Sequence, residues 1–166
     1  MVQAEDTIVT SLENLFCKYS LQLFISALAV TGCPERAEDA VQEAFYRLFR
    51  LEHKPQHLKA YVFRCVRNAA LDQLERNRPV EIKDDEFIFD SSERPAETAE
   101  RNEFRQEVVQ AMKTLSDDEQ EIVISHVYAD LSFREIAKAR EISINTIWSW
   151  YRRGMEKLRR QLETKL

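Results

Sequence analysis

The sequence predicts an all-α protein built from two small helical domains that are joined by an acidic linker. Only two of its 166 residues are glycine and four are proline, whereas leucine, glutamate, arginine and alanine, which favour helices, are abundant. β-Hairpins depend on turns that contain glycine, so almost no strand is expected. The hydrophobic share of 44% is ordinary for a chain that folds around a core.

The distribution of charge locates the linker. The net charge of −5 is not spread evenly, because residues 79–100 carry two basic and eight acidic groups. Residues 1–78 carry ten of each sign, and residues 101–166 carry twelve basic and eleven acidic groups. The acidic segment contains Pro79 and Pro95 and lacks an amphipathic helical pattern, which indicates a linker between a domain of residues 1–78 and a domain of residues 101–166.

Three helices are expected in the first domain. Apolar residues recur at helical spacing over residues 12–28, Phe16 among them, and this helix should end near Gly32. A second helix should begin at Pro34, because proline suits the first helical position. The third should run over residues 58–77, with an outward polar face that comprises Arg64, Arg67, Asn68 and Arg76.

The second domain has the pattern of a helix-turn-helix. Ser116 with Glu119, and Ser132 with Glu135, match the capping box that begins a helix. Ser143 offers a third N-cap. The helix after Ser132 is short, the following turn is also short, and the next helix is long and basic, which is the layout of a DNA-binding helix pair.

The long helix of this pair has distinct inward and outward faces. The turn before it requires a positive φ at Glu141, which costs a non-glycine residue about 1 kcal/mol. The expected inward stripe comprises Ile144, Ile147, Tyr151, Met155, Leu158 and Leu162. The outward face comprises residues suited to base edges and phosphates, namely Asn145, Thr146, Ser149, Arg152 and Arg153. Trp148 is expected to be partly buried beside Ile147 and Tyr151, more so than Trp150.

Several classes of function are disfavoured. Three cysteines without a CxxC pair indicate neither a disulfide framework nor a zinc motif. No nucleophile–base pair, metal cluster or phosphate-binding glycine loop is evident, so we expect no catalytic residue, no metal and no cofactor. The longest apolar stretch is about half of the roughly 20 residues that span a bilayer. We therefore expect a cytoplasmic protein without membrane insertion.

Both halves of the chain resemble extracytoplasmic-function (ECF) sigma factors of the sigma-70 family. The segments that resemble region 2 of these factors are EDAVQEAF (38–45), AYVFR (60–64) and RNAALD (67–72). The residues that resemble region 4 are Leu115-Ser116 with Glu119-Gln120, LSFREIA (131–137), and Ile142-Ser143 with Thr146-Ile147. Together they span most of the chain in the family's order and spacing.

The resemblance implies an initiation factor that catalyses no reaction. Such a factor binds core RNA polymerase and directs promoter recognition and DNA melting. The implied partners are the β′ clamp helices and β flap of the polymerase, promoter DNA and an anti-sigma factor.

The resemblance also implies three groups of site residues. The polymerase-binding group comprises Asp39, Gln42, Glu43 and Phe49. By spacing alone, a charged face such as the one that holds the first three is usually ordinary solvated surface. The −10 DNA-binding group comprises Lys59, Arg64, Arg67 and Asn68. The −35 DNA-binding group comprises Thr146, Trp148, Ser149, Arg152 and Arg153. Trp148 and Trp150 stand where the family more commonly has a basic residue.

Two other hypotheses remain open from the sequence. A stand-alone helix-turn-helix regulator would bind a palindromic duplex as a dimer without polymerase, whereas a sigma factor needs the core enzyme. An adaptor would bind polymerase or an anti-sigma factor without initiating transcription, and the substituted recognition helix keeps this hypothesis open.

Overall fold

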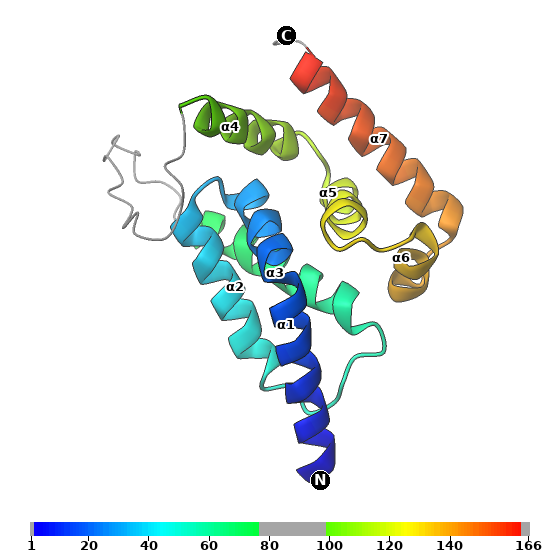
Figure 1. The fold of residues 1–166 in the computed structure, drawn as a ribbon. Helices are drawn as coiled ribbons and strands as arrows, with labels where there is room; N and C mark the ends of the chain where they lie inside the picture. The colour runs from blue at the N-terminus through cyan, green and yellow to red at the C-terminus, as the bar shows by residue number, and fades with distance from the viewer. Residues whose placement is uncertain (1, 77–98, 164–166) are drawn as a thin grey trace.

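The computed structural model describes residues 2–76 and 99–163, in which every regular element is helical (Figure 1). Side chains are described from Ile8 onward. Most of the predicted linker, residues 79–100, lies outside the described residues, and the helix that follows it begins at Ala99. No helix within the described part is long and apolar enough to cross a membrane.

The first half is a bundle of the three predicted helices, which are α1 (Val2–Thr31), α2 (Pro34–Leu48) and α3 (Leu58–Arg76). Gly32 ends α1 with a φ of 70°, and its N–H donates to the carbonyl of Leu28 at 2.8 Å. Proline then occupies the start of α2, as predicted. The bundle core includes Leu12, Leu48 and Phe63, which are almost fully buried.

The second half contains α4 (Ala99–Lys113), α5 (Asp117–Val123), a π-helical turn (Ile124–Tyr128), α6 (Phe133–Arg140) and α7 (Ile144–Glu163). Both predicted capping boxes are confirmed. Ser116 Oγ accepts from the Glu119 N–H at 3.3 Å, and Glu119 Oε2 accepts from the Ser116 N–H at 3.0 Å. Ser132 and Glu135 make the equivalent pair. Glu141 has the predicted positive φ, at 54°.

The two halves contact each other rather than standing apart. Figure 1 shows α4 above α1 and α2, and α5 between the first bundle and α7. An ideal Cβ at Gly32 would lie 3.2 Å from Val109 Cγ1 of α4, so α1 and α4 pack closely there. Buried residues of both halves form one continuous core.

The predicted inward stripe of α7 is wrong at two positions. Ile144 and Met155 are 46% and 37% exposed, whereas Ile147 is fully buried. Helix α7 packs closely against α5 at Gly154, where a Cβ would lie 3.3 Å from Val123 Cγ2. Helical periodicity identified the apolar positions of α7, but it does not say which of them another helix covers.

Candidate protein and nucleic-acid interfaces

The outward face of α2 holds three residues of the predicted polymerase-binding group, and the fourth follows the helix directly. Asp39, Gln42 and Phe49 are exposed, the last lying just after the helix. Glu43 is only half exposed, because it accepts hydrogen bonds from Arg76 Nη2 at 3.1 Å and from Gln73 Nε2 at 3.3 Å. Glu43 therefore also joins α2 to the last turns of α3.

The electrostatics of Glu43 agree with this structural role. Partial burial by itself would raise the pKa of Glu43. The hydrogen bond from Arg76 and the charges of Arg47 and Arg76 outweigh that effect and hold the pKa below its ordinary value. The carboxylate stays ionised and paired.

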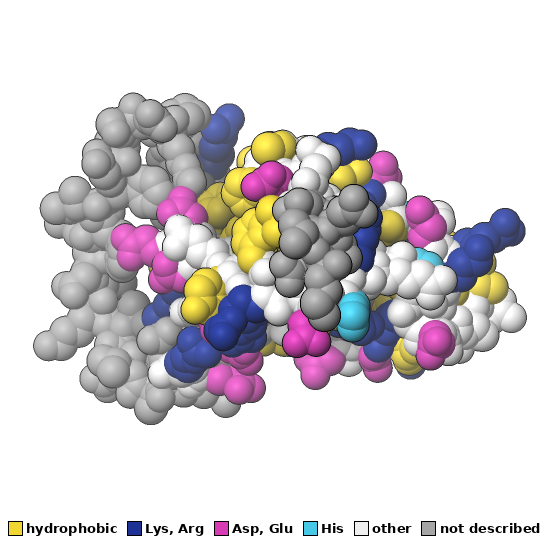
Figure 2. All heavy atoms as spheres, turned by 90° about the horizontal axis from the view of Figure 1, so that it is seen from below, with side chains coloured by type: hydrophobic (Ala, Val, Ile, Leu, Met, Phe, Trp, Pro, Cys, Tyr) yellow, Lys and Arg dark blue, Asp and Glu magenta, His cyan; other side chains and the backbone are white. Residues whose placement is uncertain are grey.

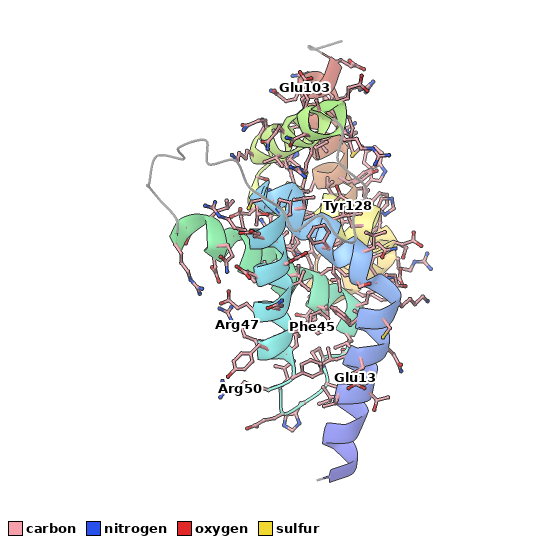
Figure 3. All side chains as sticks on the ribbon, turned by 60° about the vertical axis from the view of Figure 1, so that its left-hand side comes forward. Glu13, Phe45, Arg47, Arg50, Glu103 and Tyr128 are labelled. Carbon is pink, nitrogen blue, oxygen red and sulfur yellow. The ribbon has the colours of Figure 1, made fainter. Side chains whose placement is uncertain are left out.

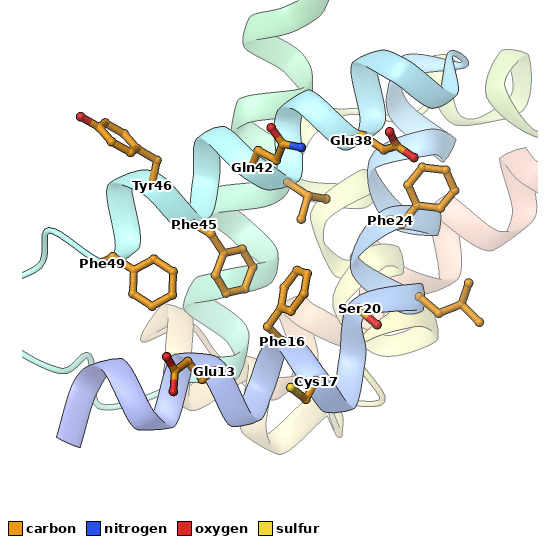
Figure 4. Close-up of a pocket in the computed structure, with 12 residues that line it drawn as sticks. Glu13, Phe16, Cys17, Ser20, Phe24, Glu38, Gln42, Phe45, Tyr46 and Phe49 are labelled. Atoms are coloured by element: carbon orange, nitrogen blue, oxygen red, sulfur yellow. The ribbon is translucent and has the colours of Figure 1, made fainter. Parts of the chain in front are cut away.

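An apolar groove of about 920 Å³ lies beside this face, between α1 and α2. The Phe16 and Phe45 rings meet edge to face with centroids 5.0 Å apart, and Phe49 lies 6.0 Å from Phe45. Figure 4 shows these three rings between the two helices, and Figure 3 shows Phe45 directed toward α1 while Arg47 and Arg50 extend from the other side of α2. Phe16, one of the apolar residues at helical spacing in the first helix, is 41% exposed and lines this groove.

The groove was not predicted from the sequence. It also includes Leu21, Tyr46 and the polymerase-group residue Gln42 in its lining, and Leu21 and Tyr46 are 63% and 66% exposed. Figure 2 shows hydrophobic side chains among acidic and basic ones on the face that is seen from the N-terminal end of α1. Acidic residues Glu13 and Glu38 lie at the edges of the groove. A continuous apolar surface that includes several exposed aromatic side chains is typical of an interaction surface.

The four residues of the predicted −10 group lie along α3 but in different environments. Lys59 Nζ lies 3.2 Å from the Tyr19 hydroxyl and 4.6 Å from the centroid of the Tyr19 ring. This lysine lowers the pKa of Tyr19, first through the hydrogen bond and also through its charge. Asn68 is exposed, and Arg64 is partly exposed.

Arg67 is the exception, because the predicted outward orientation of its side chain is wrong. Its side chain is 5% exposed. Arg67 Nε donates to Gln120 Oε1 at 3.1 Å, and Nη2 lies 3.2 Å from Asp117 Oδ1, both on α5. Arg64 makes a parallel contact, from Nε to Glu121 Oε1 at 2.8 Å. The pattern of α3 marks this face as polar, but a partner helix from the second half covers it.

The predicted −35 group lies on the first half of α7. Trp148, Arg152 and Arg153 are exposed, and Thr146 and Ser149 are half-buried. The Arg152 guanidinium lies 5.1 Å from the centroid of the Trp148 ring. Arg153 Nε lies 4.0 Å from Glu119 Oε1, so this arginine faces α5 in part. A cation and an exposed indole therefore stand side by side near the start of the helix.

The predicted burial of the two tryptophans is reversed. Trp148 is 49% exposed, whereas Trp150 packs against the core. The Arg140 guanidinium, at the end of α6, lies 5.3 Å from the Trp150 ring centroid. Trp150 lies one helical turn after Ile147 and is covered in part by Arg140 of α6, whereas the Trp148 ring contacts Arg152 of its own helix.

Comparisons with known proteins agree with the division into two halves. A family model described as sigma-70 region 2 matches residues 15–80, and one described as sigma-70, region 4 matches residues 105–158. The ECF RNA polymerase sigma factor SigM of Bacillus subtilis (strain 168) is 22% identical over 136 residues, which are 80% of this chain and 83% of SigM.

A solved structure has the same fold. It is the co-crystal structure of the sigma factor RpoE in complex with the anti-sigma factor NepR from Bartonella quintana, with a TM-score of 0.60 and 24% identity. The match covers 92% of this chain and 97% of RpoE. Near-complete coverage of both chains indicates that the halves follow the same order in both proteins.

Proposed function

The chain belongs to the ECF sigma factors of the sigma-70 family, and from this premise we propose how its surfaces divide the work of transcription initiation. The outward face of α2, together with the α1–α2 groove, binds core RNA polymerase. Helix α3 binds the −10 element, and the start of α7 binds the −35 element. No step of this function requires chemistry by the protein itself.

The groove is the observation that best supports polymerase docking. It combines exposed Phe16 and Phe49 with the polar Gln42 in one continuous surface. Stable protein interfaces have apolar, often aromatic, centres with polar rims. The β′ clamp helices are the occupant that the family resemblance implies.

Helix α7 supports duplex binding through its position and its side chains. It is the second helix of the helix-turn-helix, and such helices enter the major groove. Arg152 can pair with a base edge or a phosphate, and the half-exposed Trp148 ring can pack against a thymine methyl. Each half alone would bind weakly, and mounting both on one polymerase raises the effective concentration for promoter binding.

Run-off transcription tests the proposal. Purified core polymerase is incubated with genomic fragments, with and without this chain. New, discrete transcripts that depend on the chain are expected. A stand-alone regulator would bind duplex DNA without core enzyme and yield no new start site, and an adaptor would bind core enzyme without yielding transcripts.

Two variants and a matched control test the docking surface. Phe16→Ser and Phe49→Ser remove exposed rings of the groove, and Phe104→Ser removes a ring of α4 that is 62% exposed and lies outside the groove. We expect the first two to weaken competition for core polymerase by about tenfold or more, as truncation of aromatic interface centres commonly does. Equal affinity of all three variants would reject the groove as the docking site.

An anti-sigma factor is a further proposed partner. The solved relative of the same fold was crystallised with one. A protein that sequesters this chain would have to cover the polymerase-binding or promoter-binding surfaces. Competition between such a protein and core polymerase for the chain would test this.

A further inference from the structure

We propose that the apolar groove between α1 and α2 is also a binding site for a lipophilic organic cation, which is a positively charged group on a drug-sized apolar body. The bound cation excludes core RNA polymerase from the same surface and so regulates the factor. The ligand site rests on the lining of the groove alone, whereas the competition rests on the proposed docking role of that groove.

The size of the groove fits a small-molecule ligand. Its volume of about 920 Å³ lies within the roughly 300–1,000 Å³ that is typical of ligand pockets. Figure 4 shows that side chains of both α1 and α2 line it. Phe45 is buried, whereas Phe16 and Phe49 are exposed. A molecule that sits between the two helices would therefore remove apolar surface of the exposed rings from water, which favours binding.

The charge of the lining selects a cation over an anion. Glu13 and Glu38 are acidic, and the described residues that line the groove include no Lys, Arg or His. The attraction between a carboxylate and a cation is stronger beside apolar side chains, because less water surrounds the charges. The same two carboxylates repel an organic anion. A metal ion is a poor occupant, since the described residues include no group of three or more potential metal ligands.

The aromatic residues of the lining favour the same ligand. They are Phe16, Phe24, Phe45, Tyr46 and Phe49. The face of an aromatic ring is electrically negative and attracts a cation that lies within about 6 Å of the ring centroid. One of these rings already contacts a cation of the chain, because the guanidinium carbon of Arg50 lies 5.5 Å from the centroid of the Tyr46 ring. The rings also contact an apolar body, so one lining binds both parts of the ligand.

Two lipophilic ions of the same size and shape but opposite charge test the site. Tetraphenylphosphonium is the cation and tetraphenylborate is the anion, and their binding to the full chain is measured by isothermal titration calorimetry in sodium buffer. We expect the cation to bind at least about tenfold more tightly, because the carboxylates and the ring faces both favour positive charge. Equal affinities, or tighter binding of the anion, would overturn the proposal.

Three variants of the full chain locate the bound cation. Glu13→Gln removes an exposed carboxylate of the groove, and Glu103→Gln makes the same change on α4, at an exposed position outside the lining. Phe16→Ser removes an exposed ring. We expect the dissociation constant of tetraphenylphosphonium to rise about threefold in Glu13→Gln and about fivefold in Phe16→Ser, and to stay unchanged in Glu103→Gln. Unchanged binding in both groove variants would place the cation elsewhere and reject the site.

Competition connects the ligand to polymerase docking. At ten times its dissociation constant, tetraphenylphosphonium should weaken the binding of the parent chain to core polymerase by about tenfold, as expected for two ligands of one surface. Binding of the cation without any loss of polymerase affinity would reject the regulatory part of the proposal.

The docking experiment with Phe16→Ser and Phe49→Ser contains no ligand, so it tests the proposed function separately. Loss of docking in those variants, combined with equal affinities of the two ions for the parent, would reject the cation site alone. Full docking in those variants, combined with preferential binding of the cation to the parent, would support the cation site and reject the groove as the polymerase-binding surface.

Discussion

The faces of α2 and α3 are both predicted functional surfaces, yet the folded chain leaves one open and covers the other. Asp39, Gln42 and Phe49 on or next to α2 are exposed. On α3, Arg67 is buried against α5. The difference teaches that a polar helix face is not necessarily a solvated face, because charged groups from a distant part of the chain can satisfy it.

The same contrast recurs within each half. Glu43 is tied to α3, whereas Asp39 on the same helix is exposed. In the second half, Trp150 is covered by α6 and Trp148 is open. The two residues of each pair are chemically similar, but one is packed against another helix and the other is exposed. Comparing a substitution of one with a substitution of the other therefore separates effects on stability from effects on binding.

The largest difference in stability is expected between Arg67 and Asn68. Arg67→Ala leaves the Gln120 carbonyl oxygen without its donor and removes buried volume, which should lower the free energy of unfolding by about 2–3 kcal/mol. Asn68→Ala, on the exposed side, should change it by less than about 0.5 kcal/mol. Urea denaturation measures both. Equal losses would mean that Arg67 is solvated.

The tryptophan pair should differ next most. Trp150→Arg replaces a ring packed on the core with a cation close to Arg140, and should cost about 1–2 kcal/mol of stability. Trp148→Arg should leave stability unchanged and steepen the salt dependence of holoenzyme binding to duplex promoter DNA by about one unit, because one phosphate contact is gained. Thermal unfolding and a salt titration of binding measure the two effects. If Trp148→Arg lowers the free energy of unfolding more than Trp150→Arg does, then Trp148 rather than Trp150 packs on the core.

The two carboxylates of α2 should separate binding from folding. Glu43→Ala removes the acceptor for Arg76 and Gln73 and should cost about 1 kcal/mol of stability. Asp39→Ala should cost almost none and should still weaken competition for core polymerase. Chemical denaturation and the competition assay are run on both variants. Unchanged polymerase affinity in Asp39→Ala would make that face ordinary surface.

The smallest expected effect is a pH dependence that differs between the two capping-box glutamates. Burial alone would raise the pKa of Glu119, but hydrogen bonds from Lys157 and the Ser116 backbone, with the charges of Lys157 and Arg153, lower it. The pKa of the exposed Glu135 is lowered chiefly by the Ser132 backbone hydrogen bond. Both pKa values are lower in the folded than in the unfolded chain. The stability that they contribute is therefore present above the unfolded pKa, roughly 4.3, and is lost as pH falls through the folded value.

Substitution by glutamine distinguishes the two. The parent loses stability as the pH falls. Glu119→Gln should make this loss smaller than Glu135→Gln does, since only Glu119 also pairs with α7. Unfolding curves between about pH 3 and pH 7 would measure this difference. The opposite order would show that Lys157 contributes little to holding α7 against α5.

The sequence by itself determined the helices and their ends. Pro34 at the start of α2, the capping boxes at Ser116 and Ser132, and the positive φ of Glu141 all act over a few residues, so local chemistry was sufficient to predict them. The two family matches likewise follow from local motifs. The exposure of Asp39 and Gln42 on α2, and of Arg152 and Arg153 on α7, agrees with helical periodicity for the same reason.

Only the tertiary structure decided which of those faces are open. The Arg67–Asp117 and Arg64–Glu121 contacts join residues at least 50 positions apart. The α1–α2 groove and the covered Trp150 also depend on which helices meet, and helical periodicity contains no information about that. Periodicity reports the direction of a side chain relative to its own helix axis, whereas burial depends on what another element places in that direction.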